Sequence, residues 1–169
     1  SGAQYNQALT YKQYPNAVES NPKLTDTQAQ AAVADGYLCS IDNFGSVKVC
    51  TDINSLTSFS EDKDEDFSKN RVVRTLMQIC NDTYEHFCNY IIGKVNNTGP
   101  GRNLIKSWIV GYLNDMQANE GIQDFTAEDV TVSPGNRADA VVVEIDVHPV
   151  DAVEKIYINI TVSLTTQTE

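Results

Sequence analysis

The chain has 169 residues with a hydrophobic fraction of 41%, and its 23 acidic and 12 basic residues give a formal net charge of −11. This length suits one domain with its own core, together with an ordered arm or a small subdomain. The acidic balance repels phosphate backbones and argues against nucleic-acid binding as the main activity. No apolar run approaches the roughly 18 residues that span a bilayer, and the first residues lack the basic and apolar regions of a signal peptide. We therefore expect no direct membrane insertion.

The first part of the chain predicts an extended segment and then a short helix. Residues 1–23 are polar and rich in tyrosine, contain Pro15 and Pro22, and show no periodicity. We expect them to form an extended lead-in that lies on other structure. Residues 25–35 predict a helix, because Thr-Asp-Thr-Gln offers a capping box and Gly36 offers a carboxy-terminal stop.

Two short β-like runs around residues 43–45 predict a hairpin. Its apolar face is expected to carry Tyr37, Cys39, Ile41, Val47 and Val49. This register puts Cys50 on the opposite face and argues against a Cys39–Cys50 disulfide, although a slip of one residue would permit it. Cys80 and Cys88 are eight residues apart on a predicted helix, too far to bond. We therefore predict reduced, buried thiols, consistent with a cytosolic origin.

Two longer helices follow an acidic, irregular connection at residues 52–67. Ser68 is the expected cap of the first helix, which runs to about residue 92, and its apolar residues recur at steps of three and four. The second helix is expected over residues 102–119, with Gly121 as its stop.

From residue 130 onward the hydrophobic period is two, which predicts strands. We expect a short strand at residues 130–132, a turn at 133–136, and a longer strand at 141–147 that His148 and Pro149 interrupt. Helices followed by strands, without strand–helix–strand alternation, predict an α+β fold. In this fold the helices pack on one face of a mainly antiparallel sheet, and extended arms lie at the termini.

The last strand is the most regular part of the sequence. Its aliphatic side chains alternate with polar ones and share one face: Ile156, Ile158, Ile160, Val162 and Leu164. Such a strand either completes its own sheet or leaves the domain to pair with a neighbour's sheet edge. The expected division is a lead-in (1–23), a core domain (24–153) and a carboxy-terminal arm (154–169).

The residues do not assemble into a catalytic or ligand-binding constellation. His86 and His148 are isolated and belong to no metal-binding pair. The acidic run at 61–66 lacks the glycine and terminal glutamate of a calcium loop, and residues 99–101 lack the lysine of a phosphate loop. We predict that the chain is not an enzyme and has no catalytic, metal or cofactor site. A small enzyme or ligand-binding domain with an unrecognised site is the alternative from another class.

Five segments of the sequence match a known pattern, in order and over nearly the whole chain: LTYKQYPNAV (9–18), DINSLTSF (52–59), FSKNRVVRTL (67–76), YIIGKVNN (90–97) and HPVDAVEKIYINITV (148–162). Together they resemble the carboxy-terminal part of contractile tail sheath proteins. The sheaths concerned are those of myophages and of phage-tail-like bacteriocins from Gram-positive bacteria.

The resemblance implies a structural subunit that polymerises around a tail tube and contracts to drive the tube through a cell envelope, without a cofactor. It implies four kinds of partner: further copies of the chain, the tail tube protein, baseplate proteins and tail terminator proteins. It also implies a place in a virion tail or bacteriocin particle that assembles in the bacterial host cytoplasm. Relatives carry further amino-terminal domains, so we expect a fragment or a compact sheath form. Another tail or baseplate subunit is the nearest alternative.

The resemblance further assigns residues 155–164 to an arm that adds a strand to a neighbouring subunit. Residues 148–152, with His148, Pro149 and Asp151, are the hinge candidate, and an ordinary kink between strands is the alternative. Because sheath subunits hold the tube through this domain, three basic residues near the turn between the long helices are the candidate tube-facing group, with solubilising charges as the alternative: Lys94, Arg102 and Lys106.

Overall fold

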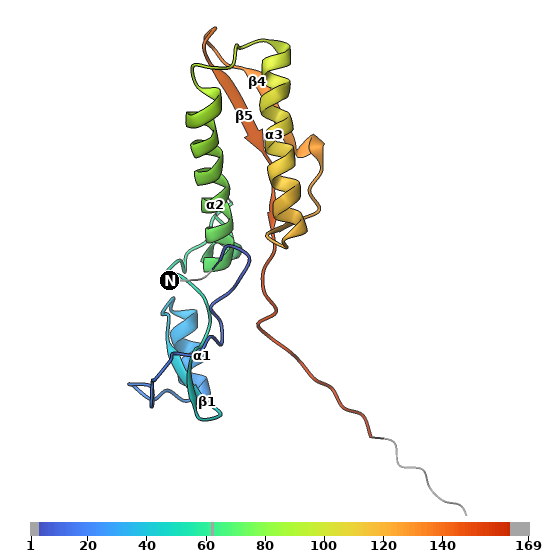
Figure 1. Cartoon of the computed structure of the whole chain (residues 1–169). Helices are drawn as coiled ribbons and strands as arrows, with labels where there is room; N and C mark the ends of the chain where they lie inside the picture. Colours follow the sequence, from blue (N-terminus) through green and yellow to red (C-terminus); the bar gives the residue numbers. More distant parts are fainter. Residues whose placement is uncertain (1–3, 62, 163–169) are drawn as a thin grey trace, which may run out of the picture.

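Two long helices lie side by side and carry most of the hydrophobic core (Figure 1). The computed structural model describes residues 4–61 and 63–162. Helix α2 (Asn70–His86) continues into a π-helical turn (Phe87–Ile91), and helix α3 (Gly99–Ala118) returns beside it. The most deeply buried aliphatic side chains come from α3 and from the strands behind it: Ile109, Leu113, Ile122 and Val130. Within the described residues, no helix combines the length and apolarity needed to cross a membrane.

The strands form three separate two-stranded antiparallel sheets. Strand β4 (Val130–Pro134) pairs with β5 (Val141–Ile145) and packs against α3, while β3 (Ile122–Gln123) pairs with β6 (His148–Pro149). The α+β class and the antiparallel pairing are confirmed, but the expected sheet is divided. The short β3 was not predicted, since two residues carry no periodic signal.

The amino-terminal unit is built on helix α1 (Asp26–Ala34) and a hairpin of β1 (Ser40–Asn43) and β2 (Ser46–Val49). Thr25 and Gln28 form the predicted capping box at the start of α1. The lead-in runs along the other edge of β2, where the backbone N–H groups of Tyr11 and Tyr14 donate to carbonyls of β2, each at 2.9 Å. These bonds hold the lead-in against the hairpin.

The register of the hairpin differs from the predicted one. Ser40 lies opposite Val49, because Phe44 and Gly45 alone form the turn, with φ of 48° and 76°. These positive φ values at both central positions are typical of the two-residue turn that suits a twisted hairpin. The prediction assumed a turn of three residues at 43–45, and this shift of one residue exchanges the neighbours across the strands.

The ends of the long helices also differ from the predicted ones. Ser68 belongs to a 3₁₀ helix (Glu65–Ser68), and α2 starts at Asn70 without a side-chain cap at Lys69. Helix α3 starts earlier than predicted, since Thr98 caps it by accepting from the Gly101 N–H at 3.2 Å.

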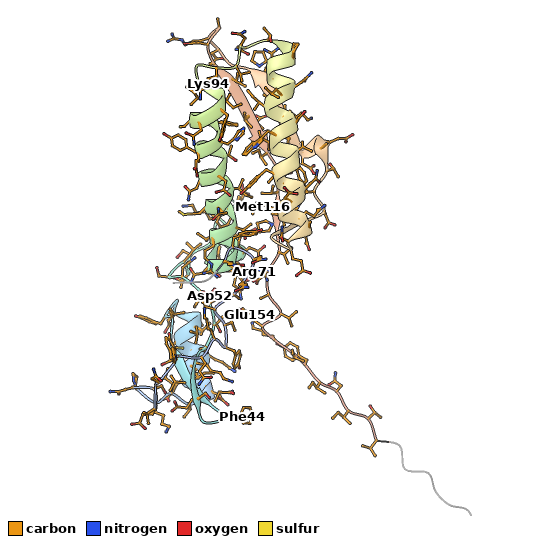
Figure 2. The ribbon with its side chains drawn as sticks, viewed as in Figure 1. Phe44, Asp52, Arg71, Lys94, Met116 and Glu154 are labelled. Atoms are coloured by element: carbon orange, nitrogen blue, oxygen red, sulfur yellow. The ribbon has the colours of Figure 1, made fainter. Side chains whose placement is uncertain are left out.

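A buried carboxylate joins the two units. Asp52, whose relative exposure is 1%, accepts hydrogen bonds from the Leu9 N–H at 2.9 Å, from Asn70 Nδ2 at 3.0 Å and from Arg74 Nη2 at 2.6 Å. Burial alone raises the pKa of Asp52, but the three donors outweigh this effect and the net pKa is lowered. The ionised Asp52 therefore links the lead-in to helix α2, in the region where Figure 2 labels it.

Candidate functional site

The end of the described chain leaves the body of the molecule as an extended arm (Figure 1). Between residues 151 and 162 the structure records no strand and no helix. Four of the five aliphatic side chains predicted for one face are exposed by 75–82%: Ile156, Ile158, Ile160 and Val162. The fifth, Leu164, lies outside the described residues. An extended segment with an exposed apolar face and no backbone partner is typical of an interaction segment.

The segment just before the arm is held by backbone pairing. His148 and Pro149 form β6 opposite Gln123 and Ile122, and the Val150 N–H donates to the Gly121 carbonyl at 3.1 Å. Asp151 follows, with its carboxylate 3.8 Å from Lys69 Nζ. The proposed hinge residues are therefore bound to the body in this conformation, and motion there requires these bonds to open. The hinge at 148–152 stays a prediction.

A cluster of charged and polar side chains anchors the root of the arm. The Glu154 side chain is only 8% exposed, forms an ion pair with Lys69 and accepts a hydrogen bond from the Thr10 hydroxyl. Burial lowers the pKa of Lys69, but the carboxylates of Glu154, Asp151 and Glu65 outweigh it and raise the net pKa. Lys69 stays charged, and its ammonium group ties the start of α2 to the arm. Sequence reasoning missed this anchor, because nothing local brings residues so far apart together.

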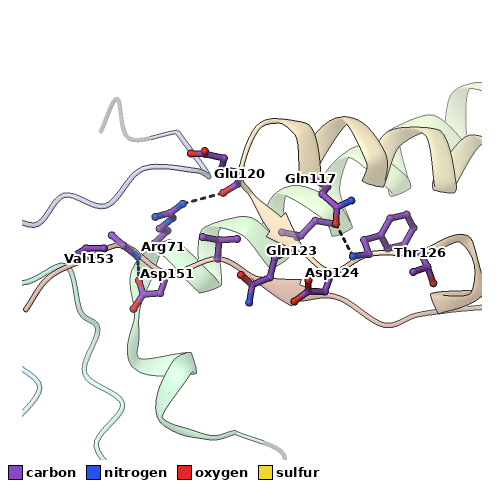
Figure 3. A pocket seen from close by; sticks show the side chains of 12 residues that line it. Arg71, Gln117, Glu120, Gln123, Asp124, Thr126, Asp151 and Val153 are labelled. Atoms are coloured by element: carbon purple, nitrogen blue, oxygen red, sulfur yellow. Dashed lines mark hydrogen bonds between the residues drawn. The ribbon is translucent and has the colours of Figure 1, made fainter.

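A broad, open groove of about 930 Å³ lies beside this root (Figure 3). Arg71, which is 7% exposed, forms part of its wall and donates to the Glu120 carbonyl at 3.1 Å. Asp124, Asp151 and Val153 lie along the same groove. Its lining includes neither histidine nor cysteine, and its polar groups bond mainly to the backbone, as Gln117 does to the Phe125 N–H at 2.7 Å.

A second groove, of about 320 Å³, lies between the end of helix α2 and β5. Its apolar lining comes from Phe87 and Ile91 of the π-helical turn and from Val141 and Val143 of β5. Polar and charged residues also line it: Asn96, Asn97, Arg102 and Asp139. In the described part of the chain, β5 has one hydrogen-bonded neighbour, β4, so its other edge is open. An open strand edge beside a partly apolar groove is suited to receiving another strand.

The three basic candidates for tube contact lie near the turn between α2 and α3, where Figure 2 labels Lys94. Lys94 donates to the Asn89 carbonyl and lies 5.9 Å from the centre of the Tyr90 ring. Arg102 Nη1 donates to Asn97 Oδ1 at 2.8 Å, and Lys106 is half-buried on α3. The structure brings these residues to one end of the helix pair. That they face the tail tube stays a prediction.

The residues considered for catalysis or metal binding are dispersed. His86 stacks on Trp108 with ring centres 3.6 Å apart, and burial lowers its pKa. His148 lies in β6. The Asp64 carboxylate accepts from the Asp66 N–H and so caps a 3₁₀ helix. Among the residues that the structure describes, no group of three potential ligands could hold a metal ion.

Comparison with known proteins identifies the family. Residues 62–163 match the Phage tail sheath C-terminal domain. The chain is 36% identical to the uncharacterised protein YqbK of Bacillus subtilis over 96% of its own length. It is also 30% identical to the tail sheath protein of Clostridium phage phiCD119 over 72% of its length. It spans 37% and 34% of these two relatives.

Comparison with solved structures leads to the same family. The sheath tail protein of Desulfitobacterium hafniense matches with a TM-score of 0.82 and 38% identity, over 96% of this chain and 38% of that one. The sheath tail protein Lin1278 of Listeria innocua matches with a TM-score of 0.78 and 30% identity, over 92% of this chain and 38% of that one. A chain of the anti-feeding prophage baseplate shares the fold, with a TM-score of 0.64 at 15% identity over 84% of this chain and 40% of that one. The chain belongs to the phage tail sheath family, as a sheath C-terminal domain.

Proposed function

We propose that this chain is the linking domain of a contractile tail sheath subunit, which polymerises around a tail tube and contracts to drive the tube through a cell envelope. The role is structural and non-enzymatic, with further copies, the tube protein and the baseplate and tail terminator proteins as partners. The particle would be a virion tail or a tail-like bacteriocin assembled in the host cytoplasm. The observation that supports this proposal best is the exposed aliphatic face of the arm.

The arm has the properties of a strand that pairs with another subunit. It combines alternating aliphatic side chains with backbone groups that no described strand pairs. Burying each Ile or Val would contribute about 1.5–3 kcal/mol before ordering costs, and the backbone would add a row of hydrogen bonds. Several such contacts hold two subunits together through a large rigid-body movement.

The open edge of β5 is the receiving site that we infer for this arm. The second groove offers apolar side chains beside that edge, and an incoming strand presents one aliphatic residue at every second position. Ile158 or Ile160 of a neighbour would fill the space lined by Phe87, Ile91 and Val143. In the proposed division, residues 24–153 receive a strand and residues 154–169 supply one, while residues 1–23 form the lead-in.

The arm is tested in the full-length protein by replacing Ile158 and Ile160 with Asp. Because both charges would be buried at the subunit contact, electron microscopy should show at least about tenfold fewer sheath polymers. The matched control replaces Asn159 and Thr161 with Asp, which adds the same charge to the polar face of the same arm. Normal polymers from the aliphatic-face variant, with the control also normal, would refute the linking role. In electron micrographs a sheath protein should form tubes or rings, whereas a small enzyme should remain monomeric in solution.

A further inference from the structure

Two cysteine thiols face each other across the amino-terminal hairpin. Continuing the register from Ser40 and Val49 puts Cys39 opposite Cys50, and the Cys50 N–H donates to the Cys39 carbonyl at 2.9 Å. Side chains opposite each other on an antiparallel pair lie on the same face. Both cysteines are free thiols and half-buried, so they are neighbours and reachable from solvent.

The backbone geometry of this pair suits a covalent bridge. Opposed residues that share a backbone hydrogen bond have Cα atoms about 5.5 Å apart. Disulfides in proteins span Cα separations of about 4.4–6.8 Å, a range that includes this separation. By contrast, Cys80 and Cys88 are exposed and lie eight residues apart along α2 and the π-helical turn, roughly 12 Å along the axis. Of these two pairs, the one in the hairpin is the pair that can bond.

We propose that Cys39 and Cys50 form a redox site that closes into an intrachain disulfide when the protein meets a disulfide oxidant. The thiolate of Cys50 attacks one sulfur of the oxidant, forming a mixed disulfide and releasing one thiol. Cys39 then loses its proton to solvent and attacks the Cys50 sulfur, which releases the second thiol. Two cysteine thiols are oxidised and one small disulfide is reduced to two thiols.

The environment of Cys39 supports this order of attack. Burial raises the pKa of the Cys39 thiol, and the neighbouring Cys50 thiol raises it further. The raised pKa makes Cys39 a poor first nucleophile, so it takes the resolving step. The bridge would join the ends of β1 and β2 around the ten residues 40–49. Disulfides persist outside the cell and not in the reducing cytosol, so the hairpin would be reinforced after release.

The test exposes the native full chain to oxidised glutathione and maps its cysteine peptides by mass spectrometry. We expect one peptide pair linked through Cys39 and Cys50, with the loss of two hydrogen atoms and no glutathione retained there. The Cys39→Ser variant should instead stop at a glutathione adduct on Cys50. The matched control, with Cys80→Ser and Cys88→Ser together, should form the same linked pair as the original chain.

A second measurement does not depend on any variant. The oxidised native chain should unfold at a higher denaturant concentration than the same chain treated with a reductant, because the bridge constrains the unfolded hairpin. Cys39 and Cys50 that stay free thiols, or that retain separate glutathione adducts, would overturn the proposal. So would a linkage of either residue to Cys80 or Cys88.

Discussion

Lys69, the residue that precedes helix α2, forms an ion pair with Glu154, which lies two residues before the first aliphatic residue of the arm, Ile156. The Thr10 hydroxyl also donates to the Glu154 carboxylate, so the lead-in, the helix and the arm meet at one point. Because β6 and this ion pair both bind the root, the arm is free only beyond residue 154. The described contacts thus favour a pivot after Glu154, and the hinge at 148–152 stays a prediction.

Replacing Glu154 with Gln should loosen this root. The variant removes the charge that balances the half-buried Lys69 ammonium, and we expect a loss of about 1–3 kcal/mol of unfolding free energy. Amide hydrogen exchange at residues 150–154 should become faster. The control is Lys155→Gln, which changes the charge of an exposed neighbour. Unchanged exchange at the root in Glu154→Gln would contradict the anchor.

The carboxylate of Asp52 should make stability depend on pH in the acid range. Its pKa in the folded chain lies below its ordinary value of 3.8, so it stabilises the fold above that pH. The stabilisation is lost as the pH falls through the lowered pKa. Asp52→Asn should cost about 2–3 kcal/mol at neutral pH, since it leaves the Arg74 charge without its partner.

Urea titrations between neutral pH and the acid range measure both effects. The original chain should lose stability below pH 3.8 more steeply than Asp52→Asn. Equal slopes in the two chains would show that Asp52 does not carry this dependence.

The groove beside β5 should be sensitive to an added charge. Ile92 lines this groove and is 64% exposed, so Ile92→Glu changes the proposed receiving site with little effect on the core. In the full-length protein we expect at least about tenfold fewer polymers, because an incoming aliphatic strand would have to bury the carboxylate. Met77→Glu is the control, since Met77 is 63% exposed on α2 and does not line the groove. Equal assembly by both variants would place the receiving site elsewhere.

Two glycines should respond in opposite directions to substitution by alanine. A Cβ at Gly121 would lie 2.6 Å from Tyr5 Cε2, so Gly121→Ala should cost about 1–3 kcal/mol by displacing the lead-in. Gly111 lies on the exposed face of α3 with open space around it, and Gly111→Ala should stabilise the chain by about 0.5–1 kcal/mol. Thermal or urea unfolding measures both, and a neutral Gly121→Ala would contradict the close contact with Tyr5.

Charge reversal at the end of the helix pair tests tube contact. Lys94→Glu and Lys106→Glu together should weaken association of the full-length protein with tube and reduce its dependence on salt. Arg102 is left unchanged because it also lines the groove beside β5. Lys12→Glu is the control, because Lys12 is exposed in the lead-in, away from that end. If the variant still binds the tube with the original salt dependence, these basic residues do not contact the tube and serve only as solubilising surface charges.

Local signals in the sequence determined the helices, the capping box at Thr25 and Gln28, the α+β class and an arm with one aliphatic face. Each depends on residues within a few positions of one another, where spacing and propensity act directly. The hairpin register was wrong because one turn residue decides which side chains oppose each other. The pairing of β3 with β6, the Asp52 cluster and the Lys69–Glu154 ion pair were not foreseen. They join residues far apart in the sequence, and only the packing of the whole chain decides which of many possible partners meet.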